Sequence, residues 1–349
     1  MAQINENLIR SVFEEMLKHK ATLAKMVMDE EEDEEVTDFR ILADLVTKNF
    51  PWPIGVELRR LFSGSMRQLD RMRLDQIFKT IERSMQFLSF VMLSQLVNEK
   101  TEGRITIPES FSREFSNRFF VLSMGNFAWL IRSIGNIFED QKTEWFMPEM
   151  AENFSGKFYN ALDFWIPERN EIGHYQINLT QEDIERRCVE YEEKLTFILQ
   201  KIAFLAKYKL VSVKEIKVIK SKVQQATFHH IIDLLNSSDS DFKAKEFKEP
   251  AFTESHSVLL MKTMKSLEEY LNLSPLVIDT STEILDTKEK FNIKKDIFMY
   301  SKFRNDQLMF LGTEVTEKCD LRSLKNYEVL LMEFRQLLFA VTGSDQLAL

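Results

Sequence analysis

A long stretch with helical periodicity, residues 66–97, constrains the fold more than any other feature of this sequence. Its apolar side chains recur at steps of three and four residues, which places them on one face of an α-helix. The residues that follow this spacing are Leu74, Ile77, Phe78, Ile81, Met85, Leu88, Met92 and Leu96. The second half, 87–97, is apolar nearly all round, as is typical of a helix buried at the centre of a fold. We therefore expect a mainly helical protein with this helix in its core.

Shorter segments extend the helical pattern over most of the first two thirds of the chain. They cover residues 4–19, 38–48, 54–62, 121–138 and 147–164. The chain has only 9 Gly and 7 Pro in 349 residues, and so few helix breakers favour long helices over tight turns. Its 29 Phe predict a large aromatic core.

A further helix is predicted to start after Thr180. Thr180 followed by Asp183 resembles a capping box, in which the threonine side chain accepts a hydrogen bond from the backbone of the third helical residue. Beyond this cap, apolar residues step alternately by four and three between residues 184 and 205. This stripe predicts a helix with one face packed against another surface.

The pattern changes near residue 208, where short segments rich in β-branched residues begin. The expected strands are 210–219, 228–235, 257–262, 270–279, 297–303 and 307–312. Residues 304–306 suit a hairpin turn between the last two strands, and an amphipathic helix over 321–341 closes the chain. The sequence therefore predicts a helical domain over residues 1–207. A small antiparallel β-rich domain with a closing helix is predicted over 208–349.

The cysteine content and the hydropathy indicate where the protein works. Cys188 and Cys319 are too few for a disulfide framework or a zinc site, so we expect free thiols in a reducing compartment. The longest apolar runs contain Ser, Gln or Asn and are too short to span a membrane. The N-terminal segment has no signal-peptide pattern. We therefore expect a cytoplasmic protein without membrane association.

The chain is acidic overall, with a formal net charge of −9 at pH 7. Seven carboxylates form the run 29–35, which we interpret as a solvated loop, with docking of a basic partner as the alternative. Lysines gather instead at 207–222, where Lys214, Lys217 and Lys220 recur every third residue. These three could form a basic rim for RNA phosphates. Such lysines more often keep an edge strand soluble, which is the use we favour.

The best catalytic candidate is the segment 169–174, with the sequence RNEIGH. An arginine followed by a histidine at about this distance is common by chance, but an asparagine directly after the arginine lowers the chance expectation to roughly 0.04 matches. This Arg-Asn-x-x-x-His pattern, late in a helical domain and between two long helices, resembles the ribonuclease motif of the HEPN superfamily. Segments 270–276, 296–300 and 309–311 are similar to the C-terminal part of bacterial proteins found near phage-defence genes.

The resemblance implies an endoribonuclease that uses no metal ion or other cofactor. His174 would be the general acid or base, because an imidazole titrates near neutral pH. Arg169 would bind the phosphate and stabilise the charge that builds up on it. Asn170, four residues before His174 on a helix, would orient the ring or hold the phosphate. HEPN ribonucleases form dimers in which two motifs face one another, and the stripe between 184 and 205 would then be the dimer face.

Two functions remain open from the sequence. One is RNA cleavage by a homodimer, in the setting of a toxin or abortive-infection effector with a regulatory or antitoxin protein as partner. The other is a non-catalytic dimeric scaffold that docks a partner protein, in which Arg169 simply pairs with Glu168 or Glu171 and His174 is structural. The P-loop, dinucleotide-binding, zinc-protease and serine-hydrolase motifs do not occur in the sequence.

Overall fold

The computed structural model describes most of the chain. The described residues are 4–27, 38–174, 179–223, 225–235, 244–249, 253–254, 256–267, 269–280, 296–314, 321–324 and 326–344. For residues 172–174, 244–249 and 323 the description covers the backbone only. The acidic run 29–35 and Cys319 lie outside the described residues.

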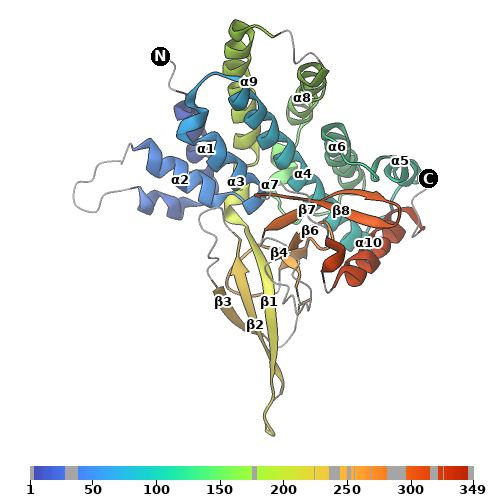
Figure 1. The fold of residues 1–349 in the computed structure, drawn as a ribbon. Coiled ribbons are helices and arrows are strands. Elements are labelled where there is room, and N and C mark those ends of the chain that lie inside the picture. The colour runs from blue at the N-terminus through green and yellow to red at the C-terminus, as the bar shows by residue number, and fades with distance from the viewer. Residues whose placement is uncertain are drawn as a thin grey trace. The chain divides into compact units, whose positions relative to one another are not determined.

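The chain forms two compact units, and the boundary between them falls inside one long helix. The helical unit comprises the described parts of Met1–Phe87 and Met147–Tyr208. The mixed unit comprises those of Leu88–Phe146, Lys209–Leu235 and Asp241–Leu349. Helix α4 (Arg71–Thr101) starts in the first unit and ends in the second (Figure 1). The division into a helical domain over 1–207 and a β-rich domain over 208–349 stays a prediction.

The helical unit is built entirely from helices in its described part. Its α-helices, besides the first half of α4, are α1 (Glu6–His19), α2 (Phe39–Asn49), α3 (Trp52–Leu61), α7 (Glu149–Asn153), α8 (Gly156–His174) and α9 (Gln181–Lys201). Short 3-10 helices connect them: η1 (Ala21–Met26), η2 (Gly64–Arg67) and η3 (Ala203–Lys207).

The apolar stripe of α9 is buried within the helical unit. Thr180 caps the helix, and its side chain accepts a hydrogen bond from the backbone N–H of Asp183 at 3.2 Å, which confirms the predicted start. Behind this cap, the stripe residues Cys188, Tyr191, Leu195, Ile198, Ile202 and Leu205 are at most 1% exposed. The interpretation of this stripe as a dimer face is therefore wrong. Its side chains are already used in packing against helices of the same unit, α1 among them.

The mixed unit combines helices with two antiparallel sheets. Its helices, besides the end of α4, are α5 (Glu109–Arg118), α6 (Met124–Asp140), η4 (Leu321–Ser323) and α10 (Tyr327–Thr342). One sheet has the order β3-β2-β1-β4-β5 and the other β6-β7-β8. The strands are β1 (Lys209–Ile219), β2 (Thr227–Leu234), β3 (Ala244–Glu249), β4 (Val258–Met261), β5 (Tyr270–Asn272), β6 (Val277–Asp279), β7 (Ile297–Arg304) and β8 (Gln307–Gly312). These elements confirm the predicted fold class, mainly α with small antiparallel sheets and a closing helix.

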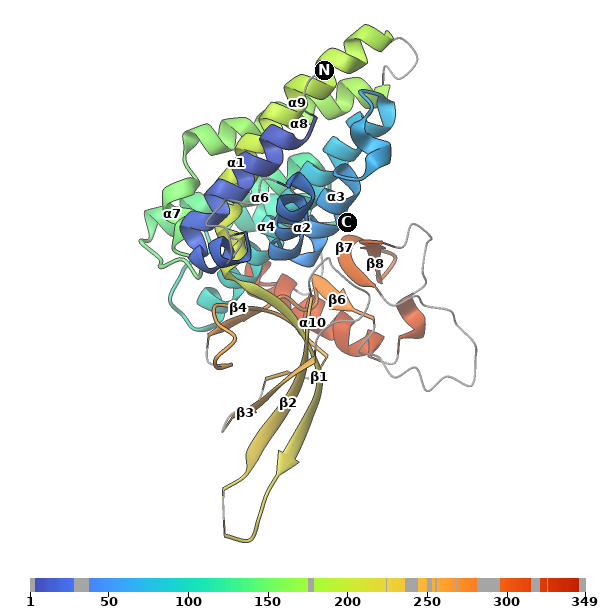
Figure 2. The same ribbon diagram turned by 90° about the vertical axis from the view of Figure 1, so that its left-hand side faces the viewer.

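Strands β1 and β2 form a long twisted hairpin (Figure 2). Their register places Val211 opposite Leu234 near the base and Ile219 opposite Thr227 near the tip. The base packs on an apolar cluster made of Val211, Val213, Ile232, Leu259, Met261 and Leu267. Toward the tip the burial of β1 gives way to exposed side chains, so the apolar contacts of this hairpin come from its base.

Two turns set the strand boundaries of the second sheet. Asn305 and Asp306 have φ values of 52° and 55°, as a type I′ hairpin turn requires, which confirms the predicted turn between β7 and β8. The segment 270–279, predicted as one strand, is instead split into β5 and β6, which lie in different sheets. Pro275 lies between them, and because it has no N–H it cannot donate to a strand ladder.

An aromatic cluster holds α10 against the rest of the mixed unit. The ring of Phe119 lies 5.9 Å from that of Phe334 on α10, 4.3 Å from Phe115 on α5 and 5.1 Å from Tyr300 on β7. The Tyr300 hydroxyl donates a hydrogen bond to the backbone carbonyl of Phe119 at 2.7 Å. This cluster is part of the aromatic core that the high Phe content predicts.

Candidate functional site

The candidate motif forms the end of α8, in the helical unit. The periodicity predicts a helix end at residue 164, with Pro167 opening a new turn, whereas α8 continues through Pro167 to His174. Inside a helix, proline loses one backbone hydrogen bond and crowds the preceding turn. The helix persists because the neighbouring side chain of Trp165 is fully buried and fixes this segment in place.

Aromatic rings tie this end of α8 to two other helices. The ring of Trp165 lies 5.6 Å from Phe78 of α4 and 5.5 Å from Tyr191 of α9, both in edge-to-face arrangements. Phe164 lies 5.7 Å from the same tyrosine. Such edge-to-face contacts stabilise the packing in addition to the burial of apolar area that the aromatic rings provide. The turn of α8 that precedes the motif is therefore packed against α4 and α9.

Arg169 forms an ion pair with a carboxylate of α4. Its Nη2 lies 3.3 Å from Oε1 of Glu82, and the two side chains are 48% and 30% exposed. The pairing with Glu168 or Glu171 considered from the sequence does not occur. In this half-exposed setting the arginine is neutralised but open to solvent, so an incoming phosphate could compete with Glu82.

The two glutamates beside Arg169 are bound by a different arginine, Arg187 of α9. Its Nη1 lies 3.2 Å from Glu168 and its Nη2 lies 2.6 Å from Glu171. Burial alone lowers the pKa of Arg187, but hydrogen bonds with Glu171 and Tyr191 outweigh it and raise the pKa above its usual value. Arg187 therefore stays charged and clamps α8 to α9.

Tyr191 completes this clamp. Its hydroxyl donates a hydrogen bond to Glu168 and accepts one from Arg187 at 3.0 Å. Burial, together with the adjacent charge of Glu168, raises the pKa of Tyr191 well above its usual range. The phenol is therefore neutral at physiological pH and acts as a hydrogen-bond donor that positions Glu168.

The three motif residues do not share one face of α8. Successive residues of a helix are rotated by about 100°, so the position of Asn170 lies about 40° from that of His174, and that of Arg169 about 140° away. Asn170 is exposed. The backbone of His174 ends the helix, while its side chain lies outside the described part. One copy of the chain therefore presents the arginine and histidine positions on different sides of α8.

The three lysines considered for RNA contact belong to the mixed unit. Lys214 is 22% exposed, and its Nζ lies 3.0 Å from Asp233 on the neighbouring strand β2. Lys217 pairs with Glu215 at 3.1 Å on the exposed half of β1, and Lys220 follows the end of that strand as an exposed residue. Lys217 and Lys220 are thus accessible to a ligand, while Lys214 is paired with Asp233 and lies 3.8 Å from the buried carboxylate of Asp279.

The described residues offer neither a cluster of metal ligands nor a membrane-spanning helix. Among these residues, no group of three or more His, Cys, Asp or Glu is placed to hold a metal ion. None of the helices in the described part is long and apolar enough to cross a membrane.

Comparison of the chain with protein-family models, with curated proteins and with solved structures found no match in any of the three searches.

Sequence reasoning missed the two partners that define this site, Glu82 and Arg187. Glu82 lies 87 residues before Arg169, and Arg187 lies 16 residues after Glu171. A weak signal for the clamp exists, because Glu168 and Glu171 are three residues apart and so share a face of α8. Nothing local in the sequence points to Glu82.

Proposed function

We propose that the chain is a metal-independent endoribonuclease of the HEPN type, with Arg169, Asn170 and His174 as its catalytic residues. The observation that supports this proposal best is the solvent-accessible ion pair of Arg169. A half-exposed guanidinium on the last turns of a well-packed helix can bind phosphate with two parallel hydrogen bonds. The exposed amide of Asn170 adds a hydrogen-bonding group next to it.

The proposed reaction is an internal transfer within the RNA. The ribose 2′-oxygen forms a bond to phosphorus while the bond from phosphorus to the 5′-oxygen of the next nucleotide breaks. His174 takes the 2′-OH proton or gives a proton to the departing 5′-oxygen. Arg169 stabilises the negative charge on the phosphate oxygens as it builds up. The products carry a 2′,3′-cyclic phosphate and a 5′-OH.

Two copies of the chain would complete the site. The position of Arg169 lies about 140° from that of His174 around α8. In one copy of the chain the two residues therefore face different sides of the helix. In a homodimer the arginine of one copy can act with the histidine of the other. Since the stripe of α9 is buried, the dimer face would have to lie elsewhere on the helical unit.

The biological setting we propose is a cytoplasmic toxin or abortive-infection effector. Such an enzyme requires control by a regulatory or antitoxin protein. The ion pair with Glu82 offers one means of control, because a partner or dimer that draws the carboxylate away would release Arg169 for phosphate. The exposed Lys217 and Lys220 are candidates for further RNA contacts.

The test is cleavage of total tRNA and of a long single-stranded RNA by the purified full-length protein in excess EDTA. Wild type is compared with His174→Ala, Arg169→Ala and the control Arg186→Ala. Arg186 is an exposed arginine of α9 that pairs with Asp183. Wild type and the control should cleave and leave cyclic-phosphate ends. The other two variants should lose about a hundredfold or more in rate. Equal cleavage by all four proteins would refute the assignment of the site.

A non-catalytic scaffold is the second candidate, favoured by the acidic surroundings of the motif. Glu82, Glu168 and Glu171 neutralise both nearby arginines in the free chain. Such a surface suits a basic protein partner better than RNA. Expression in a host separates the two functions: a ribonuclease should be toxic as wild type and tolerated as His174→Ala, whereas a scaffold should be tolerated in both forms.

A further inference from the structure

The mixed unit contains a cavity of about 1240 Å³ that the sequence did not indicate. It lies between α10, the second half of α4, the start of α5 and the connection from β5 to β6. Small-molecule sites are typically concave, with volumes of roughly 300–1,000 Å³ and a mixture of apolar walls and a few converging polar groups. The cavity is open and somewhat larger than this range, so it can hold a small organic molecule with part of its surface exposed.

One side of the cavity is apolar. Met332 and Phe339 of α10 are 57% and 61% exposed, although both side chains are large and hydrophobic. Val97 of α4 also lines the cavity. If the apolar or aromatic part of a ligand bound here, it would shield Met332 and Phe339 from water. The free energy gained would be proportional to the apolar area that is covered.

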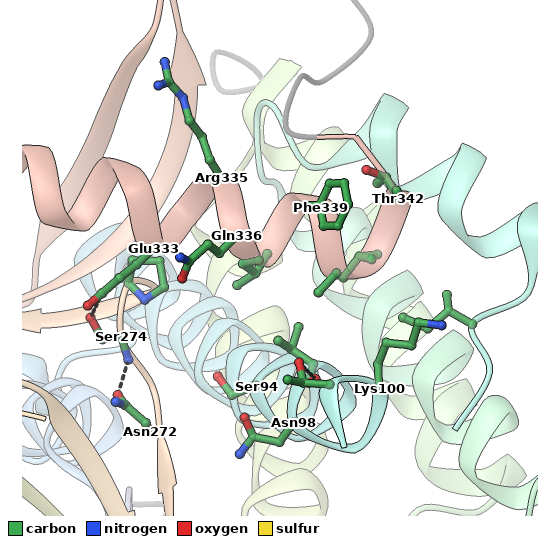
Figure 3. A pocket seen from close by; sticks show the side chains of 18 of the residues that line it. Ser94, Asn98, Lys100, Asn272, Ser274, Glu333, Arg335, Gln336, Phe339 and Thr342 are labelled. Carbon is green, nitrogen blue, oxygen red and sulfur yellow. Dashed lines mark hydrogen bonds between the residues drawn. The ribbon is translucent and has the colours of Figure 1, made fainter. Parts of the chain in front are cut away.

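The other side carries hydrogen-bonding groups from three separate parts of the chain. Ser274 donates a hydrogen bond to Oε2 of Glu333 at 2.6 Å, and its backbone N–H donates to Oδ1 of Asn272 at 2.9 Å. Figure 3 shows Glu333 and Gln336 leaving α10 toward this side, with Asn98 of α4 across the hollow. These groups surround space that no side chain among the described residues fills.

The charge on this polar side is negative. Glu254 also lies on the cavity wall, where its Oε2 accepts a hydrogen bond from Asn272 at 3.2 Å. Burial raises the pKa of Glu333, and the charge of Glu254 raises it further. The two carboxylates are therefore close enough to repel each other, and the environment penalises the charge of Glu333.

The cations along the wall do not neutralise these carboxylates. Arg335 also lines the cavity, but its Nη2 pairs with Asp306 at 3.4 Å. Lys100 lies at the end of the cavity opposite Glu333 (Figure 3). A phosphate or carboxylate at the Glu333 end would be repelled, whereas a positive group there would relieve the repulsion between Glu333 and Glu254.

We propose that this cavity binds a small organic cation, an amine or amidine attached to an apolar or aromatic body. Its positive group donates hydrogen bonds to Glu333 and to the neighbouring polar side chains, and its body rests on Phe339 and Met332. The proposal does not depend on the proposed ribonuclease activity, because the cavity belongs to the mixed unit and the motif to the helical unit. A ligand-binding site in this unit gives the chain a means of sensing a small molecule.

The test uses matched probes on the full-length protein, observed by saturation-transfer NMR and titration. Phenethylamine and benzamidine are the cationic probes, phenethyl alcohol is the neutral one and phenylacetate the anionic one. Wild type should bind the cations about tenfold more tightly than the other two. Glu333→Gln should remove most of this preference. The control Glu328→Gln, an exposed position on the same helix outside the cavity, should retain it.

A second variant separates loss of the site from loss of the fold. Phe339→Ala changes an exposed side chain, so the protein should fold normally while binding of all four probes weakens together. The proposal is overturned if wild type binds no cationic probe, or if cations have no advantage over phenethyl alcohol. It is equally overturned if a folded Glu333→Gln protein keeps the full preference for cations.

Discussion

Arg169 of α8 and Glu82 of α4 form an ion pair, with Nη2 of the arginine 3.3 Å from Oε1 of the glutamate. Arg169, the residue proposed to bind phosphate, is therefore already paired with the carboxylate of Glu82 in the free chain. If Arg169 binds RNA as proposed, a phosphate has to displace this carboxylate. The strength of the ion pair would then set part of the free energy that RNA binding costs.

Replacing Glu82 with glutamine should make RNA binding easier. Because exposed ion pairs are worth up to about 1 kcal/mol, we expect KM for RNA cleavage to fall by up to about fivefold. Steady-state cleavage of a fluorescent RNA by Glu82→Gln measures this change. Glu190→Gln, which removes an exposed carboxylate of α9, controls for the change in net charge. A KM that rises for Glu82→Gln but not for Glu190→Gln would contradict a phosphate-binding role for Arg169.

The clamp between α8 and α9 should contribute to stability through Arg187. This side chain is 14% exposed and contacts Glu168 and Glu171, so Arg187→Met leaves both carboxylates without their cation. We expect the free energy of unfolding to fall by about 1–3 kcal/mol. The neighbouring Arg186→Met removes an exposed pair with Asp183 and should cost at most about 0.5 kcal/mol. Urea unfolding of both variants measures the difference, and equal losses would argue against a clamp.

Cys188 should be almost unreactive in the folded protein. Burial raises the pKa of this thiol to about 11, and its Sγ lies 3.5 Å from the backbone carbonyl of Asp70. At pH 8 the thiolate fraction is about a hundredfold below that of an ordinary cysteine. A Cys319→Ser variant isolates Cys188 for reaction with a thiol reagent. The reaction should be slow in buffer and fast in urea. Fast reaction in buffer would mean that the Cys188 side chain is accessible to solvent in the folded protein.

The stability contribution of Glu333 should depend on pH. Burial and then the charge of Glu254 raise the pKa of Glu333 above its ordinary value of 4.5. The folded state therefore holds this proton more tightly than the unfolded state does. The stabilisation is complete below pH 4.5 and is lost as the pH rises through the folded-state pKa. Glutamine imitates the protonated form, so Glu333→Gln should gain stability relative to wild type at pH 7 but not at pH 4.

Urea unfolding of wild type and Glu333→Gln at the two pH values measures this difference. Because both proteins share every other titrating group, the change in their difference isolates Glu333. Glu328→Gln, on the exposed side of α10, should show a smaller change between the two pH values. A Glu333→Gln difference that is the same at pH 4 and pH 7 would contradict the buried setting of this carboxyl.

Much of the local structure follows from the sequence. The spacing of apolar residues over 66–97 predicts α4, and Thr180 marks the start of α9 through its side-chain cap. Asn305 and Asp306 allow the left-handed turn between β7 and β8. Each of these signals depends on residues close together in the chain, where backbone geometry alone fixes which side chains meet.

Only part of the candidate site can be predicted from the sequence. The motif residues were located from their pattern, and the structure places Arg169 and Asn170 as exposed residues on α8. The alternative interpretation, in which Arg169 pairs with Glu168 or Glu171, is suggested by local spacing on one helix, but Arg169 pairs with Glu82 of α4 instead. Arg187, which is 14% exposed, pairs with those two glutamates instead, because α9 packs along α8 and brings its guanidinium to them.

The sequence by itself determined the helical class, the change to strands near residue 208 and the position of the candidate motif. Only the tertiary structure decided that the stripe of α9 is buried, that Arg169 pairs with Glu82, and that Glu333 lines a cavity with Ser274. The physical reason is that periodicity reports which face of an element is apolar, but not which surface covers it. Pairings across 59 or 87 residues depend on how whole elements pack, and no local pattern records that.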